Sequence, residues 1–430
     1  MNTIIDPATY NKWELGHPDY AGLTERIAQA LEYVSISPEE RESVLRVLRA
    51  PECATRVDLP LPFGNYIGWR VQHCSALGPY KGGMRFHAAV DQQLLGLLAL
   101  MMTLKNSYLG LPLGGAKGGI CVDPLSLDPK QLELLTRKFA YGLRYVIGPE
   151  RDIPAPDVGT DGRIMSWITD TYRITHGGML VPAVVTGKPT YLGGIPGKGR
   201  STGRGVAHII RLAAEYFGRP LRTGTTVAIE GFGNVGSVTA EALAEMGCQI
   251  VAVSDVGGTL YNEQGLDITR LMTWAAERRG SIQGFPGGET IPRAELLLLP
   301  VDVLSPCALE GSVNLTNAHR IQAHLVAGGA NKYATDDAVE ILMERGVPYV
   351  DDRMTNGGGV VYSHAEWVQN REGMQWPERD TLQTMYGTLE RSWLRTLEIQ
   401  HRLGVPLHVA ADVVTVEPLA MAMLTRGDFL

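Results

Sequence analysis

One stretch in the second half of the chain restricts the fold more than any other. Thr225 to Glu230 (TTVAIE) has the composition of a short buried strand, and the glycine-rich segment Gly231 to Gly236 (GFGNVG) follows it. A helical pattern then runs to about Met246, and a second apolar segment, Gln249 to Ser254, ends at Asp255. A strand, a GxGxxG turn, a helix and a second strand in this order predict a unit that binds a dinucleotide.

The individual residues of this unit have separate expected roles. Gly231 permits the tight turn, Gly233 lets a pyrophosphate approach the backbone, and Gly236 allows close packing of helix and strand. The first N–H groups of the helix would bind the phosphates. Asp255 stands 24 residues after the first glycine, a spacing typical of an acid that bonds a ribose diol. We therefore expect NAD or NADP as cofactor, with a preference for NAD because a carboxylate repels the 2′-phosphate.

The rest of the chain is long enough for a second domain. Further apolar strands alternate with helices at Val301–Leu304, His324–Ala327 and Pro348–Val350, which predicts a doubly wound sheet. Their terminal loops place Asn331 and Asn356 where such a sheet binds its ligand. With 430 residues, we expect two α/β domains. Residues 1–198 form a substrate-binding and assembly domain, 199–380 a Rossmann-like domain, and helices from about 381–430 pack back on the first.

Other periodic segments predict the remaining elements. The boundary near residue 198 rests on the Gly- and Pro-rich stretch 184–206, which we interpret as a linker. Ser37-Pro38-Glu39-Glu40 is typical of a helix start. The expected helices are 20–48 (two helices), 91–107, 132–146, 360–370, 379–403 and 409–425, and the expected strand pair lies within 56–74.

Lysines are concentrated in one part of the first domain. The chain has nine Lys against 30 Arg, yet Lys81, Lys105 and Lys117 fall within 37 residues. Lys81 precedes Gly82-Gly83, and Lys117 lies inside GGAKGG, so we interpret both segments as glycine-rich loops that approach a ligand closely. Ammonium groups there can bind carboxylates, and a desolvated lysine can act as a base. The alternatives are solvated loop lysines and, for Lys105, a cation that offsets a helix dipole.

A carboxylate completes this constellation. In DIPAPD, the prolines Pro154 and Pro156 fix the backbone, so Asp157 is expected on a rigid loop near the lysines. The alternative is an Asp that bonds only its own backbone. A lysine of lowered pKa beside an Asp suits chemistry at a carbonyl or imine carbon coupled to hydride transfer.

Composition excludes several other classes of protein. A net charge of −7 without a basic run argues against nucleic acid as partner. The N-terminus lacks a signal-peptide pattern, and the apolar run Leu94–Leu104 is too short for a membrane span. Five scattered cysteines, without CxxC or HExxH, predict a reduced cytoplasmic protein with no metal site.

Several motifs resemble those of the amino-acid dehydrogenase superfamily, and within it the glutamate dehydrogenases. They occur in the family's order and cover the chain from about residue 55 to the C-terminus: GPYKGGMRFH, TLKN ahead of PLGGAKGG, DIPAPDVGT, VVTGKP, STGRGV, EGFGNVG and GGGVVYSHAEWVQN.

The resemblance implies a role for each matching residue. Lys81 would hold the side-chain carboxylate together with Ser363, and Lys105 the α-carboxylate. Lys117 would activate the water or amine that adds to the α-carbon, and Asp157 would exchange a proton with the amino group. The residues expected at the cofactor are Thr202, Gly231, Gly233, Asn234, Val235, Gly236, Asp255, Asn331 and Asn356, with Thr202 and Asn234 at the nicotinamide carboxamide.

The resemblance also implies the reaction and the assembly. Lys81 with Ser363 favours glutamate. In the leucine-type and phenylalanine-type enzymes, the position that corresponds to Lys81 resembles an aliphatic residue, because their substrates have no second carboxylate. We expect reversible, NAD(P)-dependent deamination of L-glutamate to 2-oxoglutarate and ammonia by a homohexamer. Departures from the family pattern at Gly328-Gly329, Gly357-Gly358-Gly359 and His364-Ala365 leave two alternatives. They are a regulatory or weakly active subunit assembled with a paralogue, and a dehydrogenase of another amino acid.

Overall fold

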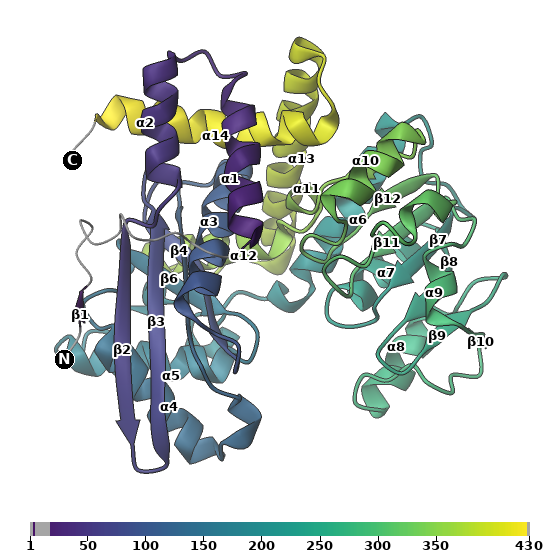
Figure 1. The fold of residues 1–430 in the computed structure, drawn as a ribbon. Coiled ribbons are helices and arrows are strands. Elements are labelled where there is room, and N and C mark those ends of the chain that lie inside the picture. Colours follow the sequence, from purple (N-terminus) through teal and green to yellow (C-terminus); the bar gives the residue numbers. More distant parts are fainter. Residues whose placement is uncertain (1–2, 5–17, 428–430) are drawn as a thin grey trace. The chain divides into compact units, whose positions relative to one another are not determined.

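The computed structural model describes residues 3–4 and 18–427, and it divides them into two compact units (Figure 1). The first unit contains the described residues up to Pro196, together with Val360–Thr381 and the residues from Arg395 onward. The second contains Gly197–Gly359 and Leu382–Leu394. Each unit is built around its own β-sheet, so the expected two-domain α/β fold is confirmed.

The first unit holds a six-stranded mixed sheet in the order β1-β2-β3-β5-β4-β6. The pairs β1–β2, β2–β3 and β3–β5 are antiparallel. Strand β4 runs parallel to both of its neighbours, β5 and β6. The strands are β1 (Thr3–Ile4), β2 (Cys53–Leu61), β3 (Gly64–Cys74), β4 (Tyr80–Phe86), β5 (Gly114–Ile120) and β6 (Asp152–Pro156). The predicted strand pair is therefore present as β2 and β3.

Three segments that we predicted as loops are strands. The KGG and GGAKGG segments form β4 and β5, and the DIPAP segment forms β6, so the loop predictions for Lys81, Lys117 and the approach to Asp157 were wrong. The glycines serve strand packing: a Cβ at Gly82 would collide with the Ala116 carbonyl oxygen, and one at Gly119 with that of Arg85. Strands packed this closely lack the apolar alternation from which a strand is predicted.

Helices surround this sheet, and both ends of the described chain contribute to them. Ser37 caps α2 with a full capping box, as predicted. In Figure 1 the purple α1 and α2 lie beside the yellow α14, and Arg26 of α1 pairs with Asp412 of α14 at 3.1 Å. The helices are α1 (Pro18–Leu31), α2 (Pro38–Leu48), α3 (Gln92–Tyr108), α4 (Pro129–Gly142), α5 (Gly162–Thr175) and α14 (Leu407–Arg426).

Within the described residues, α14 is the one helix long and apolar enough to cross a membrane by length and composition. Its apolar side chains, among them Val413, Val416 and Leu419, are buried within the protein. It packs against α1, α2 and α3 of the same unit. The apolar composition of α14 is thus explained by its place in the core of the first unit.

The second unit holds a seven-stranded sheet in the order β10-β9-β8-β7-β11-β12-β13. Strands β8, β7, β11, β12 and β13 are parallel, as expected for a doubly wound sheet, and the antiparallel edge strands β9 and β10 were not predicted. The chain leaves β7 toward β8 on one side and later returns to β11 on the other, so the strand order reverses at β7. The strands are β7 (Thr226–Glu230), β8 (Gln249–Ser254), β9 (Thr259–Tyr261), β10 (Glu289–Ile291), β11 (Val303–Pro306), β12 (Leu325–Ala327) and β13 (Tyr349–Val350).

The helices of the second unit include one that replaces part of the predicted linker. Helix α6 begins at Lys198, so residues 198–206 are helical. Its glycines allow close contact: a Cβ at Gly203 would lie 2.6 Å from the Val235 carbonyl oxygen at the start of α7. The helices are α6 (Lys198–Tyr216), α7 (Gly236–Glu245), α8 (Ile268–Glu277), α9 (Arg293–Leu296), α10 (Asp336–Glu344) and α11 (Asp352–Thr355).

Two further helices contain residues of both units, and here the division differs from the limits that we predicted. Residues 360–380, which we assigned to the Rossmann-like domain, belong to the first unit, and they include most of α12 (Gly358–Glu372). A buried ion pair between Lys188 and Glu366 is the physical reason, because it fixes α12 to the first unit. Helix α13 (Glu378–Leu403) has its middle part, Leu382–Leu394, in the second unit.

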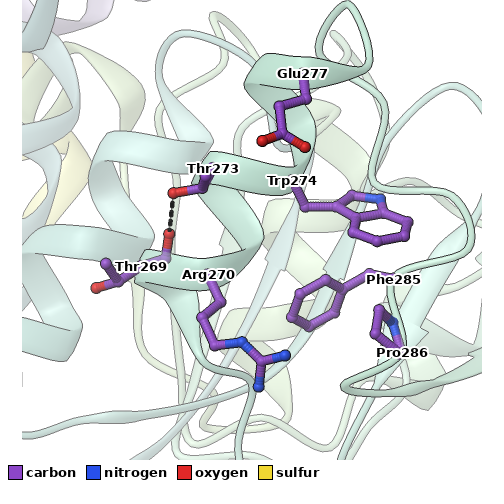
Figure 2. A pocket seen from close by; sticks show the side chains of 7 residues that line it. All are labelled: Thr269, Arg270, Thr273, Trp274, Glu277, Phe285 and Pro286. Atoms are coloured by element: carbon purple, nitrogen blue, oxygen red, sulfur yellow. Dashed lines mark hydrogen bonds between the residues drawn. The ribbon is translucent and has the colours of Figure 1, made fainter.

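Figure 2 shows a surface pocket of the second unit, formed by α8 and the loop that follows it. Trp274 and Phe285 meet there edge to face, with ring centroids 5.9 Å apart. The pocket contains none of the residues that we predicted to bind substrate or cofactor. Its lining consists of Thr269, Arg270, Thr273, Trp274, Glu277, Phe285 and Pro286.

Candidate active site

A lysine and an aspartate from different strands of the first unit are in direct contact. Lys117 lies on β5, and Asp157 directly follows β6. Lys117 Nζ donates to Asp157 Oδ1 at 2.8 Å. Arg85 Nε, on β4, donates to Asp157 Oδ2 at 2.6 Å. Lys117 is only 6% exposed, so the alternative of a solvated loop lysine is wrong for this residue. The Asp157 carboxylate bonds two side chains, so it does more than bond its own backbone.

Strand order explains this meeting of residues far apart in the sequence. Strand β4 lies between β5 and β6 and runs parallel to both. Gly83 leaves room for the aspartate above β4, since a Cβ there would lie 2.7 Å from the Asp157 Cβ. Thr160 fixes the backbone: its hydroxyl accepts from Asp157 N at 2.8 Å and donates to the Met84 carbonyl at 2.7 Å. Asp157 is thus held by side-chain and main-chain bonds together.

The surroundings of Lys117 favour its neutral form. Burial lowers the pKa of Lys117, and the nearby cations Arg85 and Arg70 lower it further, while Asp157 acts in the opposite direction. Arg70 is itself fully buried and forms an ion pair with Asp152. Since the net direction is downward, a larger share of Lys117 is unprotonated near neutral pH than for an exposed lysine. This is the property required of a general base.

The surroundings of Asp157 favour its ionised form. Burial acts to raise the pKa of Asp157, but the charges and hydrogen bonds of Lys117 and Arg85 outweigh it and the pKa is lowered. Asp157 therefore stays ionised at neutral pH and can accept a proton or pass one on. The pair joins a poised amine to an ionised carboxylate within hydrogen-bonding distance.

Lys81 lies near the start of β4 and is only 1% exposed. Ser363, on α12, is also buried. Burial lowers the pKa of the adjacent His364 to about 4, and the charge of Lys81 contributes to this shift. The positive charge of Lys81 thus acts on His364, the residue that follows Ser363 in α12. An ammonium and a hydroxyl in such a dry environment can bind one carboxylate.

Helix α12 is fixed to the first unit one turn beyond Ser363. Lys188 Nζ donates to Glu366 Oε1 at 2.8 Å, and both side chains are fully buried. Gly187 N donates to both carboxylate oxygens of Glu366, at 2.9 and 2.8 Å. The pair joins two of the quoted motifs, since Lys188 belongs to VVTGKP and Glu366 to GGGVVYSHAEWVQN. The geometry indicates that it positions α12 and, through it, Ser363.

We expect Lys188→Met to lower the free energy of unfolding of the first unit by about 3 kcal/mol, because it leaves Glu366 buried without its cation. Urea unfolding at fixed protein concentration measures this. The control is Arg49→Met, which breaks an exposed pair with Glu42 and should cost less than about 1 kcal/mol. The double variant Lys188→Met with Glu366→Gln should recover part of the loss. Equal midpoints for Lys188→Met and Arg49→Met would contradict the structural role.

Lys105 lies in the last turn of α3 and is partly buried. Helix α3 packs directly on β5, since a Cβ at Gly115 would meet Thr103. Lys105 therefore belongs to the element that covers the strand of Lys117. Among the described residues, no group of three or more His, Cys, Asp or Glu side chains could hold a metal ion.

The glycine-rich loop of the second unit fits a dinucleotide. Gly231 has φ +96°, which suits glycine, and its N–H donates to Ser254 Oγ at 3.1 Å. Gly236 opens α7, where a Cβ would collide with the Gly231 carbonyl oxygen. Gly233 is exposed, and the space where its Cβ would point contains no atom within 4 Å, so a phosphate can approach. Asn234 and Val235 continue this loop to the helix N-terminus, which attracts phosphate.

Asp255 follows β8, as predicted, and its carboxylate accepts three backbone N–H bonds. Oδ1 accepts from Gly257 at 2.7 Å and Gly258 at 3.0 Å, and Oδ2 accepts from Ile282 at 2.8 Å. The acid therefore orders its own turn and fixes the loop that precedes Phe285.

The other predicted cofactor residues come together at the ends of β12 and β13. Asn356 Nδ2 donates to Asn331 Oδ1 at 2.9 Å. Thr202 lies on α6 next to the glycines that follow Asn356, because a Cβ at Gly359 would lie 2.8 Å from Thr202 Oγ1. A Cβ at Gly328 would collide with the Pro306 carbonyl oxygen. The glycines that depart from the family pattern thus stand where this backbone packs tightly.

Sequence reasoning missed three residues of the site: Arg85, Lys188 and Arg70. Arg85 had a usable signal. In a strand, Lys81, Gly83 and Arg85 share one face, but the loop interpretation of KGGMRF hid this alternation. For Lys188 and Arg70 the partners lie far along the chain, and no local pattern indicates them.

Comparisons with known proteins complete these observations. A family model described as "Glutamate/Leucine/Phenylalanine/Valine dehydrogenase" matches residues 193–427, and one described as "Glu/Leu/Phe/Val dehydrogenase, dimerisation domain" matches residues 56–174. Glutamate dehydrogenase A2 of Halobacterium salinarum is 40% identical over 410 residues, or 94% of this chain and 97% of the relative. The NADP-specific glutamate dehydrogenase of Saccharolobus shibatae is 39% identical over 391 residues, or 89% and 92%. The solved hetero-hexameric glutamate dehydrogenase from Thermus thermophilus, in its Leu bound form, has a TM-score of 0.88 at 33% identity, covering 96% of this chain and 98% of that one.

Proposed function

Because the chain belongs to the Glu/Leu/Phe/Val dehydrogenase family, we infer that it catalyses the reversible NAD(P)-dependent deamination of L-glutamate to 2-oxoglutarate and ammonia. The resemblance read from the motifs is confirmed, and the chain is an oxidoreductase of glutamate. The observation that carries the reaction is the buried Lys117 in contact with Asp157 at 2.8 Å.

The residues of the first unit account for the proton transfers. A bound nicotinamide supplies the hydride acceptor. Loss of hydride from Cα leaves an imine, and neutral Lys117 takes a proton from the water whose oxygen then bonds to Cα. Lys117 passes this proton to Asp157, with which it is in contact, and Asp157 gives it to the nitrogen, so that ammonia leaves with the electron pair of the C–N bond. The oxygen keeps the double bond of 2-oxoglutarate after Lys117 takes its remaining proton.

Substrate recognition requires two carboxylates to be neutralised. We assign the side-chain carboxylate to Lys81 and Ser363, and the α-carboxylate to Lys105. The burial of Lys81 supports this, because a buried ammonium gains most from an anionic ligand. Thr202, Asn234, Asn331 and Asn356 would contact the nicotinamide ribose and carboxamide, while Gly231, Gly233, Val235 and Gly236 would surround the pyrophosphate.

The cofactor is NAD or NADP, and we propose a preference for NAD. Asp255 places a carboxylate at the end of β8, where a 2′-phosphate would be repelled. The NADP-specific relative from Saccharolobus shibatae shows that the family contains enzymes with the opposite choice.

Asp255→Asn should shift the ratio of kcat/KM for NADH over NADPH about tenfold toward NADPH, corresponding to about 1.4 kcal/mol. The amide removes the charge but can still accept from Gly257 and Gly258 through one oxygen. Asp267→Asn, at the N-cap of α8, is the matched control and should leave the ratio unchanged. An unchanged ratio for Asp255→Asn would assign nucleotide choice to other residues.

The chain assembles into oligomers, and we propose a homohexamer in the cytoplasm. The dimerisation-domain match over residues 56–174 supports assembly. The Thermus thermophilus structure is hetero-hexameric, so a mixed assembly with a paralogue is the second candidate. Analytical ultracentrifugation of the purified chain, combined with activity of the same fractions, separates the two. Inactive hexamers that gain activity when a paralogue is added would favour the mixed assembly.

The direct test follows reduced-nicotinamide absorbance with purified protein, 2-oxoglutarate and ammonia, once with NADH and once with NADPH. Consumption with 2-oxoglutarate, and much slower consumption with aliphatic 2-oxo acids, is expected. Faster turnover of an aliphatic 2-oxo acid would indicate that the chain is a dehydrogenase of another amino acid.

A further inference from the structure

Arg85 holds the aspartate of the candidate active site from the side opposite Lys117. Its Nε lies 2.6 Å from Asp157 Oδ2, while Lys117 Nζ lies 2.8 Å from Oδ1. One carboxylate thus bridges two cations on neighbouring parallel strands. The two cations differ in one respect: the ammonium can lose its proton in the reaction, whereas a guanidinium stays charged at any relevant pH.

The position of Arg85 is built into the strand. Lys81, Gly83 and Arg85 alternate along one face of β4, and the missing side chain of Gly83 gives Asp157 its place between the other two. Arg85 and Asp157 are partly shielded, with side chains 22% and 19% exposed. Because the guanidinium stays protonated, Arg85 can still hold the carboxylate when Lys117 is neutral.

We propose that Arg85 is a positioning residue of the reaction: it holds one oxygen of Asp157, so that the other oxygen faces Lys117 and the substrate nitrogen. The inference rests on the roles proposed above for Lys117 and Asp157. When Lys117 gives up its proton, Arg85 remains as the counter-charge of Asp157. Without it, the carboxylate is free to rotate, and the Lys117–Asp157 pair loses one of its fixed positive charges.

The charges around the pair determine the expected pH effect. They come from the neighbouring strands: Arg70 of β3 with its partner Asp152 of β6, Arg85 of β4 and Lys117 of β5. The helix that packs on β5, α3, also carries a cation, Lys105, in its last turn. Arg85 lowers the pKa of Lys117 and also that of Asp157. Removing its charge therefore raises both pKa values. Since deamination needs neutral Lys117, the acidic limb of the kcat profile should move to higher pH.

The test compares Arg85→Gln and Arg85→Lys with the natural enzyme, using kcat for glutamate deamination from pH 6 to 10. We expect Arg85→Gln to lower kcat at least about tenfold near neutral pH and to move the acidic limb upward by about one pH unit. Arg85→Lys keeps the charge, so its limb should stay in place even though kcat falls. The control Arg163→Gln breaks an exposed pair with Asp161 in the same unit and should leave kcat and its pH profile unchanged.

Two outcomes would overturn the proposal: a natural profile for Arg85→Gln, or a uniform loss at all pH values in both Arg85 variants. The second is what a purely structural role produces. Asp157→Asn is measured in parallel to separate this inference from the roles on which it rests. If Asp157→Asn keeps full activity, the proposed role of Asp157 fails. If it is inactive while Arg85→Gln is normal, only the role of Arg85 fails.

Discussion

Replacing Lys117 by alanine should lower kcat about a thousandfold while glutamate still binds, because the change removes the general base and leaves the carboxylate-binding lysines in place. The fold should survive, since Asp157 keeps its bonds to Arg85 and Thr160. The loss should be similar at all pH values, because no other amine replaces Lys117.

Two measurements test this. Turnover is followed by reduced-nicotinamide absorbance, and glutamate binding to the inactive variant by calorimetry in the presence of oxidised cofactor. Lys130→Ala, which changes an exposed lysine of α4, is the matched control and should keep the natural kcat. Residual activity above about a tenth of the natural value would remove Lys117 from its role as base. Loss of binding together with turnover would make it a substrate-binding residue instead.

Replacing Lys81 by leucine should lower kcat/KM for glutamate by about a hundredfold to a thousandfold and raise it for aliphatic amino acids. Lys81 is 1% exposed, so the substrate's side-chain carboxylate would be buried without a counter-charge. Truncating one partner of a buried charge pair costs about 2–5 kcal/mol, which gives a change of this order. Ser363→Ala should have a smaller effect of about tenfold, because it removes one hydrogen bond to a charged group.

A separate readout shows whether Lys81 lies beside α12 in solution. Burial and the charge of Lys81 together lower the pKa of His364 to about 4. Removal of that positive charge stabilises the protonated imidazole, so the pKa of His364 should rise in Lys81→Leu, as measured by NMR titration. An unchanged glutamate kcat/KM would place the side-chain carboxylate elsewhere, and an unchanged His364 titration would separate Lys81 from α12.

The sequence was most informative where the chemistry is local. The dinucleotide loop lies within six consecutive residues, Gly231 to Gly236, and the structure shows the positive φ expected at Gly231 and tight packing at Gly236. The helix starts at Ser37 and Asp91 were also predicted correctly, because a cap bonds its own first turn.

The sequence was misleading where the backbone packs so tightly that side chains are absent. The segments around Lys81 and Lys117 look like loops because they are rich in glycine. They are central strands, because Gly82 and Gly115 have no room for a Cβ. A pattern of side chains cannot indicate a strand whose defining feature is that they are missing.

By itself, the sequence determined the two α/β domains, the dinucleotide loop, the family and the residue types of the site. Only the tertiary structure decided which charges meet. Lys117 and Asp157 are 40 residues apart, and Lys188 and Glu366 are 178 apart. Caps and turns are fixed by bonds within a few residues, and so a sequence displays them directly. Ion pairs between strands depend on strand order and register, which the whole sheet fixes at once and no short segment records.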